Sequence, residues 1–196
     1  MELVWSTPNP EQVIEAAGRT CYKSEDKITP DSAGRFVKMI AKNGHESVIE
    51  HASASFRIIT DRGISHEIVR HRVATSYSQE STRYVCYGKE KFGKEITVIE
   101  PPNLDETQRL LWHVACQEAE LSYLKMLDAG ATPQITRSVL PTCLKTELVM
   151  TTNFRAWKHF IALRTSQAAH PQIREIALEI EKILTQLAPN VFHKEI

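Results

Sequence analysis

A short segment in the first half of the chain gathers cations among hydroxyl and amide side chains. Arg70-His71-Arg72 is followed by a serine-rich run with a glutamine, which ends near Arg83, and no acid intervenes until Glu80. Guanidinium groups bind phosphate through paired, charge-assisted hydrogen bonds, and serine and glutamine add neutral donors. The segment therefore predicts a site for an anion with a polar ring beside it. The alternative is a solvated basic turn with ordinary capping serines.

A second polar cluster follows Gly44 and contains two histidines and two glutamates, His45, Glu46, Glu50 and His51. Their spacing differs from the HExxH pattern that places two imidazoles on one helical face, and no cysteine marks a further ligand. We therefore predict no metal site. We expect these groups to hydrogen-bond a ligand or one another. The alternative is a polar helix start after the glycine.

A third cluster lies on an amphipathic stretch towards the C-terminus. Trp157 and Phe160 form part of an apolar stripe, and Arg164 continues the same stripe at helical spacing. A buried arginine needs an anionic or strongly accepting partner, although it can also snorkel or pair with a structural acid. Arg137 is a comparable cation within an apolar helical stretch. With the first cluster, these arginines indicate a strongly anionic ligand.

The elements that must position these clusters follow from residue periodicity and from cap and turn residues. Helices are expected over residues 10–22, 30–42, 64–71, 105–128, 132–140, 153–164 and 171–187. Strands are expected over 53–60, 95–99 and 145–152, and a loop over 73–83. Helices and strands mix without strict alternation, so we predict an α+β or irregular α/β fold, with a small mixed sheet packed with helices. We expect a single domain over residues 1–196.

Composition excludes several classes of protein. The 196 residues carry no formal net charge, whereas a non-specific nucleic-acid binder should be basic. No apolar run is long enough for a membrane span, and no signal-peptide pattern begins the chain. The four cysteines lack a CxxC pairing and predict reduced thiols in a cytoplasmic protein. The glycine-rich phosphate loops GxGxxG and GxxxxGK[ST] and the GxSxG nucleophile motif are absent from the sequence.

The three clusters together resemble the signature blocks of the flavin-dependent thymidylate synthases. That signature is RHR followed, after seven or eight residues, by serine. The blocks that match are Arg70 to Tyr84, Asn43 to His51, and Asn153 to Arg164 with the downstream Gln172-Ile173-Arg174-Glu175. The resemblance implies the thymidylate-synthase-complementing fold and C5 methylation of dUMP to dTMP. It implies methylenetetrahydrofolate as carbon donor, FAD reduced by NADPH as redox carrier, and a homotetramer with shared active sites.

The resemblance also assigns roles to individual residues. Arg164 is similar to the family's arginine that activates dUMP, and we take it as the catalytic residue. The residues similar to dUMP contacts are Glu67, Arg70, Gln79, Glu80, Ser81, Thr82, Arg83, Arg137 and Arg164. Those similar to FAD contacts are His45, Ser47, Arg70, His71, Arg72, Gln79, Asn153, Phe154, Arg155 and His159. Flavin and folate supply the carbon chemistry, while the protein positions and polarises.

Three other functions compete with this one. A flavoprotein of the same fold could act on another nucleotide. A catalytically silent nucleotide-binding module is a second alternative, but it has no need of Ser81, Arg83, Arg137 and Arg164 together. RNA binding is a third, and the zero net charge and the absence of an RNP-type aromatic motif argue against it.

Overall fold

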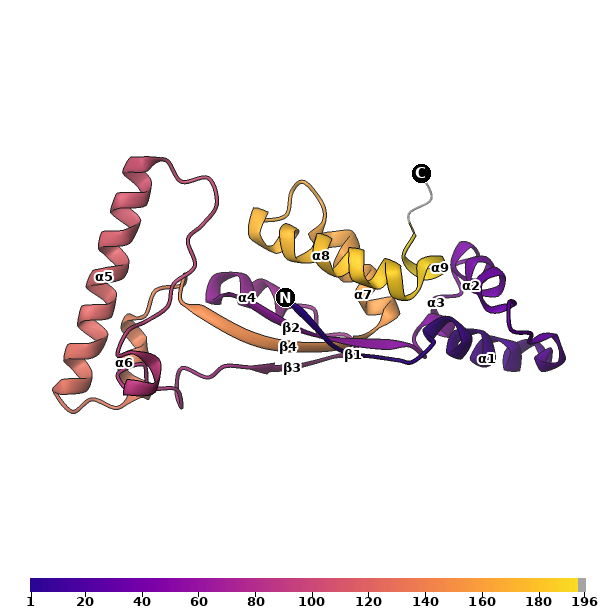
Figure 1. Ribbon diagram of the computed structural model, residues 1–196, viewed down its shortest axis with the longest axis horizontal. Helices are drawn as coiled ribbons and strands as arrows, with labels where there is room; N and C mark the ends of the chain where they lie inside the picture. Colours follow the sequence, from indigo (N-terminus) through magenta and orange to yellow (C-terminus); the bar gives the residue numbers. More distant parts are fainter. Residues whose placement is uncertain (194–196) are drawn as a thin grey trace. The chain divides into compact units, whose positions relative to one another are not determined.

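The computed structural model describes residues 1–193 and contains one four-stranded sheet in the order β1-β2-β4-β3 (Figure 1). The strands are β1 Glu2–Ser6, β2 Ser53–Asp61, β3 Thr75–Gln79 and β4 Lys145–Asn153. The α-helices are α1 Pro10–Tyr22, α2 Ala33–Lys42, α3 Glu46–Ile49, α4 Arg62–Ile68, α5 Glu106–Asp128, α6 Pro133–Thr136, α7 Phe154–Arg164, α8 Pro171–Leu187 and α9 Pro189–Phe192. Short 3-10 helices are η1 Glu25–Lys27, η2 Glu90–Phe92 and η3 Arg137–Val139. The predicted α+β class is confirmed, with a sheet that is antiparallel where a mixed one was expected.

Local sequence explains where the main elements begin. Asn153 caps α7 because its side-chain oxygen accepts from the Ala156 backbone N–H at 2.9 Å. Asp105 and Gln108 form a capping box at the start of α5. Strand β4 alternates regularly between buried and partly buried side chains, as a strand with one face on a core should.

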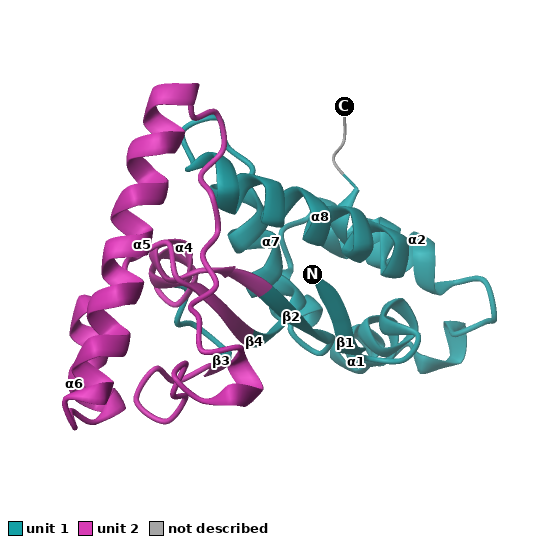
Figure 2. Cartoon of the chain, turned by 60° about the vertical axis from the view of Figure 1, so that its left-hand side comes forward, with its two compact units in different colours: residues 1–58, 71–77, 149–196 teal, residues 59–70, 78–148 magenta. Residues whose placement is uncertain are grey.

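By its contacts, the chain divides into two units, each built from separated segments (Figure 2). Unit 1 contains residues 1–58, 71–77 and 149–196, and unit 2 contains residues 59–70 and 78–148. Strands β2, β3 and β4 each have residues in both units. No helix among residues 1–193 is both long and apolar enough to cross a membrane.

Helix α7 anchors the core of unit 1. Trp157 is fully buried, donates its indole N–H to the Ala54 carbonyl at 3.1 Å, and meets the Phe56 ring edge-on at 5.2 Å. Its other neighbour is Phe160, with ring centroids 5.5 Å apart. Aromatic pairs in this geometry add about 1 kcal/mol each beyond burial. The helix that carries Arg164 is therefore held rigidly on the sheet.

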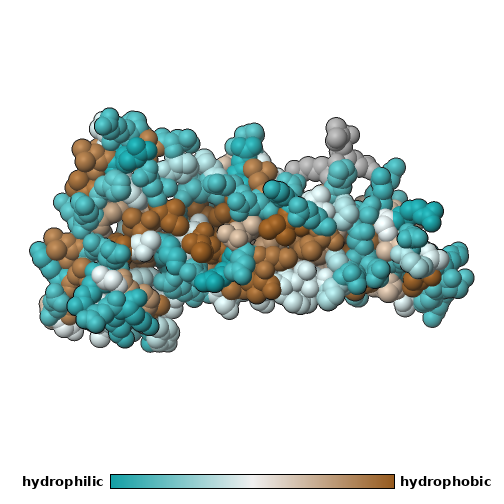
Figure 3. Space-filling view, viewed as in Figure 1, coloured by the Kyte–Doolittle hydropathy of each residue, from teal (hydrophilic) through white to brown (hydrophobic). Residues whose placement is uncertain are grey.

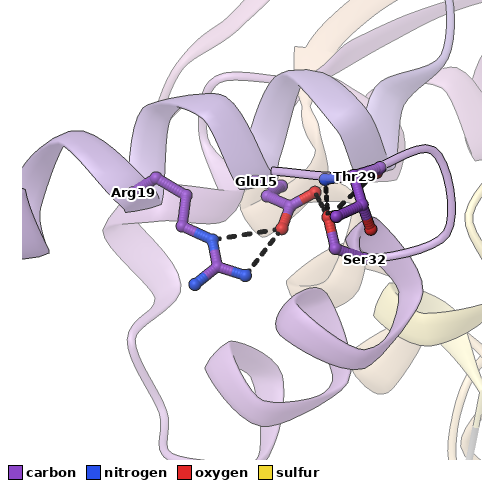
Figure 4. Close-up of polar contacts among 4 residues, drawn as sticks. All are labelled: Glu15, Arg19, Thr29 and Ser32. Carbon is purple, nitrogen blue, oxygen red and sulfur yellow. Dashed lines mark hydrogen bonds and ion pairs between the residues drawn. The ribbon is translucent and has the colours of Figure 1, made fainter. Parts of the chain in front are cut away.

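A buried polar network ties α1 to the turn that precedes α2 (Figure 4). The Glu15 carboxylate, only 1% exposed, accepts from Arg19 Nε at 3.1 Å and Nη2 at 2.9 Å, and from the Ser32 hydroxyl at 2.8 Å. The same hydroxyl oxygen accepts from the Thr29 backbone N–H at 2.9 Å. The buried carboxylate is thus paired and hydrogen-bonded, as burial of a charge requires.

Unit 2 has its own small core. It consists of Tyr87, Ile96, Tyr123 and Leu144, and the Tyr87 backbone N–H donates to the Tyr123 hydroxyl at 3.2 Å. The four cysteines are all free thiols, and the sulfur atoms of Cys116 and Cys143 lie 3.5 Å apart. That separation is too long for a disulfide bond.

Two predicted elements need correction. The loop predicted over 73–83 is wrong at residues 75–79, because these form β3 at the edge of the sheet next to β4. The strand predicted over 95–99 is also wrong, since Val98 makes only an isolated bridge to Leu144. An edge strand is held by backbone hydrogen bonds and needs no alternation of apolar residues. Strand β3 shows no such alternation, so it was not predicted as a strand.

Candidate functional site

The catalytic candidate Arg164 lies at the end of α7 and contacts the histidine of the RHR segment. Its Nε donates to His71 Nε2 at 3.0 Å. An arginine nitrogen can only donate, so His71 Nε2 must hold a lone pair and the ring proton must lie on Nδ1. The predicted accepting partner for Arg164 is therefore an imidazole, and the charge of the guanidinium is not neutralised by this contact.

The surroundings of His71 keep the imidazole neutral. Burial is the main cause that lowers its pKa from 6.5 to about 4, and the nearby charges of Arg164 and His159 contribute to the same shift. The ring also packs edge-on against Phe160 at 4.9 Å. The imidazole therefore stays uncharged until the pH falls well below neutral. Because it is uncharged, His71 acts as a hydrogen-bond acceptor for Arg164 throughout the physiological range.

The loop that carries His71 is held by two hydroxyl groups. Tyr77 donates to the His71 carbonyl oxygen at 2.7 Å, and Thr152 donates to the Ala74 carbonyl oxygen at 2.7 Å. Ala74 has a φ of 55°, in the left-handed region that favours glycine, so this turn needs outside support. Burial raises the pKa of Tyr77 to about 12, so its phenol remains a donor. The loop is thereby fixed before any ligand binds.

Two flavin candidates, Arg155 at the start of α7 and His45 just before α3, already have protein partners. Arg155 is exposed and pairs with Glu50 at 2.6 Å and with Glu46 at 3.3 Å. His45 Nδ1 lies 3.1 Å from the Tyr22 hydroxyl. The glutamates of the second cluster therefore bind α7 cations, where bonds among the cluster or to a ligand were expected. A ligand that uses Arg155 must compete with two carboxylates.

The remaining flavin candidates in unit 1 differ in accessibility. Ser47, Arg72 and His159 are exposed. Phe154 is fully buried and its ring packs on Phe192 at 5.0 Å, while the oxygen of the Asn153 side chain is occupied as the helix cap. The Phe154 ring belongs to the core of unit 1, so only its backbone could meet a ligand.

Two nucleotide candidates of unit 2, Gln79 and Glu80, have defined polar partners. The Gln79 amide donates to the hydroxyls of Ser65 at 2.9 Å and Thr146 at 3.2 Å. One carboxylate oxygen of Glu80 accepts from the Tyr87 hydroxyl at 2.7 Å. Burial, and then this hydrogen bond, raises the pKa of Tyr87, so the phenol stays protonated. The other carboxylate oxygen of Glu80 lies 3.8 Å from the Lys145 ammonium nitrogen, so Gln79 is oriented by neutral partners and Glu80 by a phenol and a cation.

The other nucleotide candidates are less enclosed. Arg83 is exposed, and its side chain donates to the Gln134 side chain at 3.2 Å. The Ser81 hydroxyl accepts from the backbone N–H of Arg83 at 3.3 Å. Arg70 and Arg137 are exposed, Glu67 is partly buried and Thr82 is 6% exposed. The prediction that Arg137 lies embedded in an apolar helix is wrong, because the stretch forms only α6 and η3, each a few residues long.

Comparison with known proteins supplies the family. A family model described as thymidylate synthase complementing protein matches residues 2–190. The chain belongs to this family. A flavin-dependent thymidylate synthase of Mycolicibacterium gilvum is 37% identical, with the match covering 97% of this chain and 82% of the relative. Relatives of the same name from Geobacter sulfurreducens and Corynebacterium glutamicum are 34% and 36% identical, covering 97% of this chain and 84% and 82% of theirs.

The predicted resemblance to the flavin-dependent thymidylate synthases is therefore confirmed. Most of the candidate flavin contacts lie in one unit of the chain, and most of the candidate dUMP contacts lie in the other. Unit 1 holds most flavin candidates, namely His45, Ser47, His71, Arg72, Asn153, Phe154, Arg155 and His159, together with Arg164. Unit 2 holds Glu67, Arg70, Gln79, Glu80, Ser81, Thr82, Arg83 and Arg137. The boundary falls inside the RHR segment, between residues 70 and 71.

Several residues that support the candidate residues were not foreseen. Tyr77 and Thr152, which hold the His71 loop, and Tyr87, which orients Glu80, received no predicted role. Tyr77 lies within the quoted RHR block, and its aromatic ring among serines was the available signal. Thr152 and Tyr87 gave none, because their roles depend on contacts between distant parts of the sequence.

Proposed function

We propose that this protein methylates dUMP at C5 to form dTMP, with methylenetetrahydrofolate as the carbon donor and NADPH as the reductant. The observation that carries the proposal is the contact between Arg164 and neutral His71 within the family's signature blocks. This neutral acceptor orients the guanidinium through Nε without adding a negative charge beside it. Placed at the N3–O2 edge of uracil, the positive charge of the guanidinium stabilises the anionic ring and raises electron density at C5.

The chemistry of the unit 1 residues fits FAD. Its pyrophosphate needs cations and hydroxyl donors at accessible positions, and Arg72, Arg155, His159 and Ser47 are all exposed. FAD, when bound, supplies the redox chemistry that amino-acid side chains lack. The protein would hold the cofactor with these residues and with the His71 backbone loop, while the ring of Phe154 would serve the core alone.

In unit 2 the nucleotide candidates would bind and orient dUMP. The amide of Gln79 is held by neutral hydroxyls, and the carboxylate of Glu80 is held by the Tyr87 hydroxyl and the Lys145 ammonium, so both side chains keep fixed directions. Arg70, Arg83 and Arg137 are exposed cations suited to a phosphate. Preorganised groups of this kind lower the reorganisation required at the reaction.

We also propose a homotetramer with shared active sites, in the cytoplasm. Helix α5 supports the assembly, because among its 23 residues only Cys116 and Tyr123 are buried. Leu110 and Leu111 are 64% and 65% exposed, and Figure 3 shows hydrophobic atoms at the surface where α5 lies. Exposed apolar patches of this kind mark interaction surfaces. The cytoplasmic location is supported by the four free thiols.

The test is dTMP formation by purified protein supplied with FAD, dUMP, methylenetetrahydrofolate and NADPH. Arg164→Ala should lower turnover by about 100-fold or more, the range found when one transition-state donor is removed, and should leave FAD absorbance intact. Arg35→Ala, an exposed arginine on α2, is the matched control and should keep full activity. Near-normal turnover in Arg164→Ala would refute the assigned role, and absence of dTMP from the unmodified protein would refute the function.

A further inference from the structure

A cavity lies in unit 1, and none of its lining residues is among those assigned to flavin or dUMP. It has a volume of 440 Å³ and is bordered by α2, α7 and the segment around α9 (Figure 1 labels all three helices). Its lining consists of Lys38, Ala41, Lys42, Lys158, Pro189, Asn190, Val191 and His193. All of these residues belong to unit 1. The volume is within the range of small-molecule sites.

The lining is rich in positive charge and contains no acid. Lys158 pairs with Glu46 at 3.2 Å, so its charge is partly compensated. Lys38 and Lys42 are both exposed, and neither forms an ion pair with any residue in the range 1–193. They lie four residues apart on α2, where like charges repel and destabilise a helix slightly. An anion in the cavity would relieve this repulsion.

The acids that contact the lining are committed to other donors. Glu11 accepts from the Asn190 backbone N–H at 2.8 Å and from its side-chain amide at 2.9 Å. Glu46 is shared between Lys158 and Arg155. Neither carboxylate is paired with Lys38 or Lys42, so two ammonium charges face the cavity lining without an internal counter-ion among the described residues.

We propose that this cavity is a binding site for a phosphate-bearing small molecule. A phosphate group carries about two negative charges near neutral pH, which matches the two uncompensated ammonium groups of Lys38 and Lys42. A single carboxylate would match only one. Ala41, Pro189 and Val191 give the cavity apolar walls that can cover an uncharged part of the ligand. This proposal does not rest on the proposed function.

The experiment is calorimetric titration of the purified full-length protein, saturated with FAD and dUMP, with inorganic pyrophosphate. Lys38→Gln/Lys42→Gln is compared with Lys125→Gln/Lys182→Gln, which removes two exposed lysines from other helices and so gives the same net charge. Pyrophosphate should bind the unmodified protein and the control equally. Its affinity for Lys38→Gln/Lys42→Gln should be at least about tenfold weaker, and rising ionic strength should weaken binding to the unmodified protein.

Three outcomes would overturn the proposal. Absence of pyrophosphate binding at millimolar concentration would show that the cavity takes no phosphate. Equal weakening in both double variants would show a general effect of net charge. Binding of a tri-glutamate peptide in place of pyrophosphate, lost in Lys38→Gln/Lys42→Gln, would show a carboxylate site. Circular dichroism of both double variants checks the fold, and failure of FAD or dUMP to bind would count against the proposed function alone.

Discussion

Protonation of His71 offers a direct test of how Arg164 is held. Lowering the pKa from 6.5 to about 4 favours the neutral ring by about 3 kcal/mol, at about 1.4 kcal/mol for each tenfold change. Because solvent reaches part of the ring, we reduce this to about 1–2 kcal/mol of folding stability. The pKa is lower in the folded protein, so this contribution is complete above pH 6.5 and disappears as the pH falls through 4. At pH 6.5 only about 0.3% of the rings should be charged.

The assay is NMR of protein labelled with ¹⁵N in the histidine rings, titrated from pH 8 towards pH 4. His71 should keep the shifts of an imidazole protonated at Nδ1 down to about pH 5. In Arg164→Ala the midpoint should rise, yet remain below 6.5, because burial is the largest cause of the lowered pKa. His71→Gln identifies the resonance. A midpoint near 6.5 in the unmodified protein, or an Nε2-protonated ring, would refute the hydrogen bond from Arg164 to His71.

Two further predictions concern groups outside this pair. Tyr77→Phe removes one hydrogen bond to the His71 carbonyl and should lower the free energy of unfolding by about 1 kcal/mol. The variant should have a lower melting temperature, and added FAD should raise that temperature by less than it does in the unmodified protein. An equal rise with FAD in both proteins would argue against a positioning role for Tyr77. Leu110→Gln/Leu111→Gln should shift the protein from a tetramer to smaller species, measured by light scattering, and should leave the circular dichroism spectrum unchanged. A tetramer that persists in this variant would exclude this part of α5 from the interface.

Elements with a clear hydrophobic period were predicted well from sequence. Helix α8 has the bounds that were predicted, 171–187, and its residues Ile173, Ala177, Ile180 and Leu184, which recur at helical spacing, are fully buried. Strand β4 was predicted to within one residue of its end. In both cases the pattern of apolar residues matches the geometric period of the element, so local sequence and tertiary packing demand the same structure.

Elements whose stability comes from pairing alone were not predicted. Strand β1 passed unnoticed because its side chains are mostly exposed, including Val4 and Trp5, and it is held by antiparallel pairing with β2. Strand β3 carries serines and a tyrosine and lies at the other end of the sheet order. Backbone pairing leaves no apolar period in the sequence, and propensity is a weak guide at a sheet edge.

The site shows the same division between residue types and their arrangement. Sequence identified the arginines and predicted that Arg164 needs an accepting partner. It could not pair Arg164 with His71, 93 residues away, or predict that Glu46 and Glu50 would bind Arg155. Hydrogen bonds and ion pairs form only between groups within a few ångströms, so they depend on which elements pack together. Residue types therefore indicate the chemistry, while partners come from the fold.

The division of the RHR segment has a consequence for how its three residues respond to change. Arg70 follows α4 in unit 2, whereas His71 and Arg72 begin the loop of unit 1 that Tyr77 and Thr152 hold. The hydrogen bonds that fix this loop do not include Arg70. Weakening them, as in Tyr77→Phe, should therefore lower affinity for FAD, assigned to His71 and Arg72, more than affinity for dUMP. Equal losses for both ligands would mean that the three residues are positioned as one rigid motif.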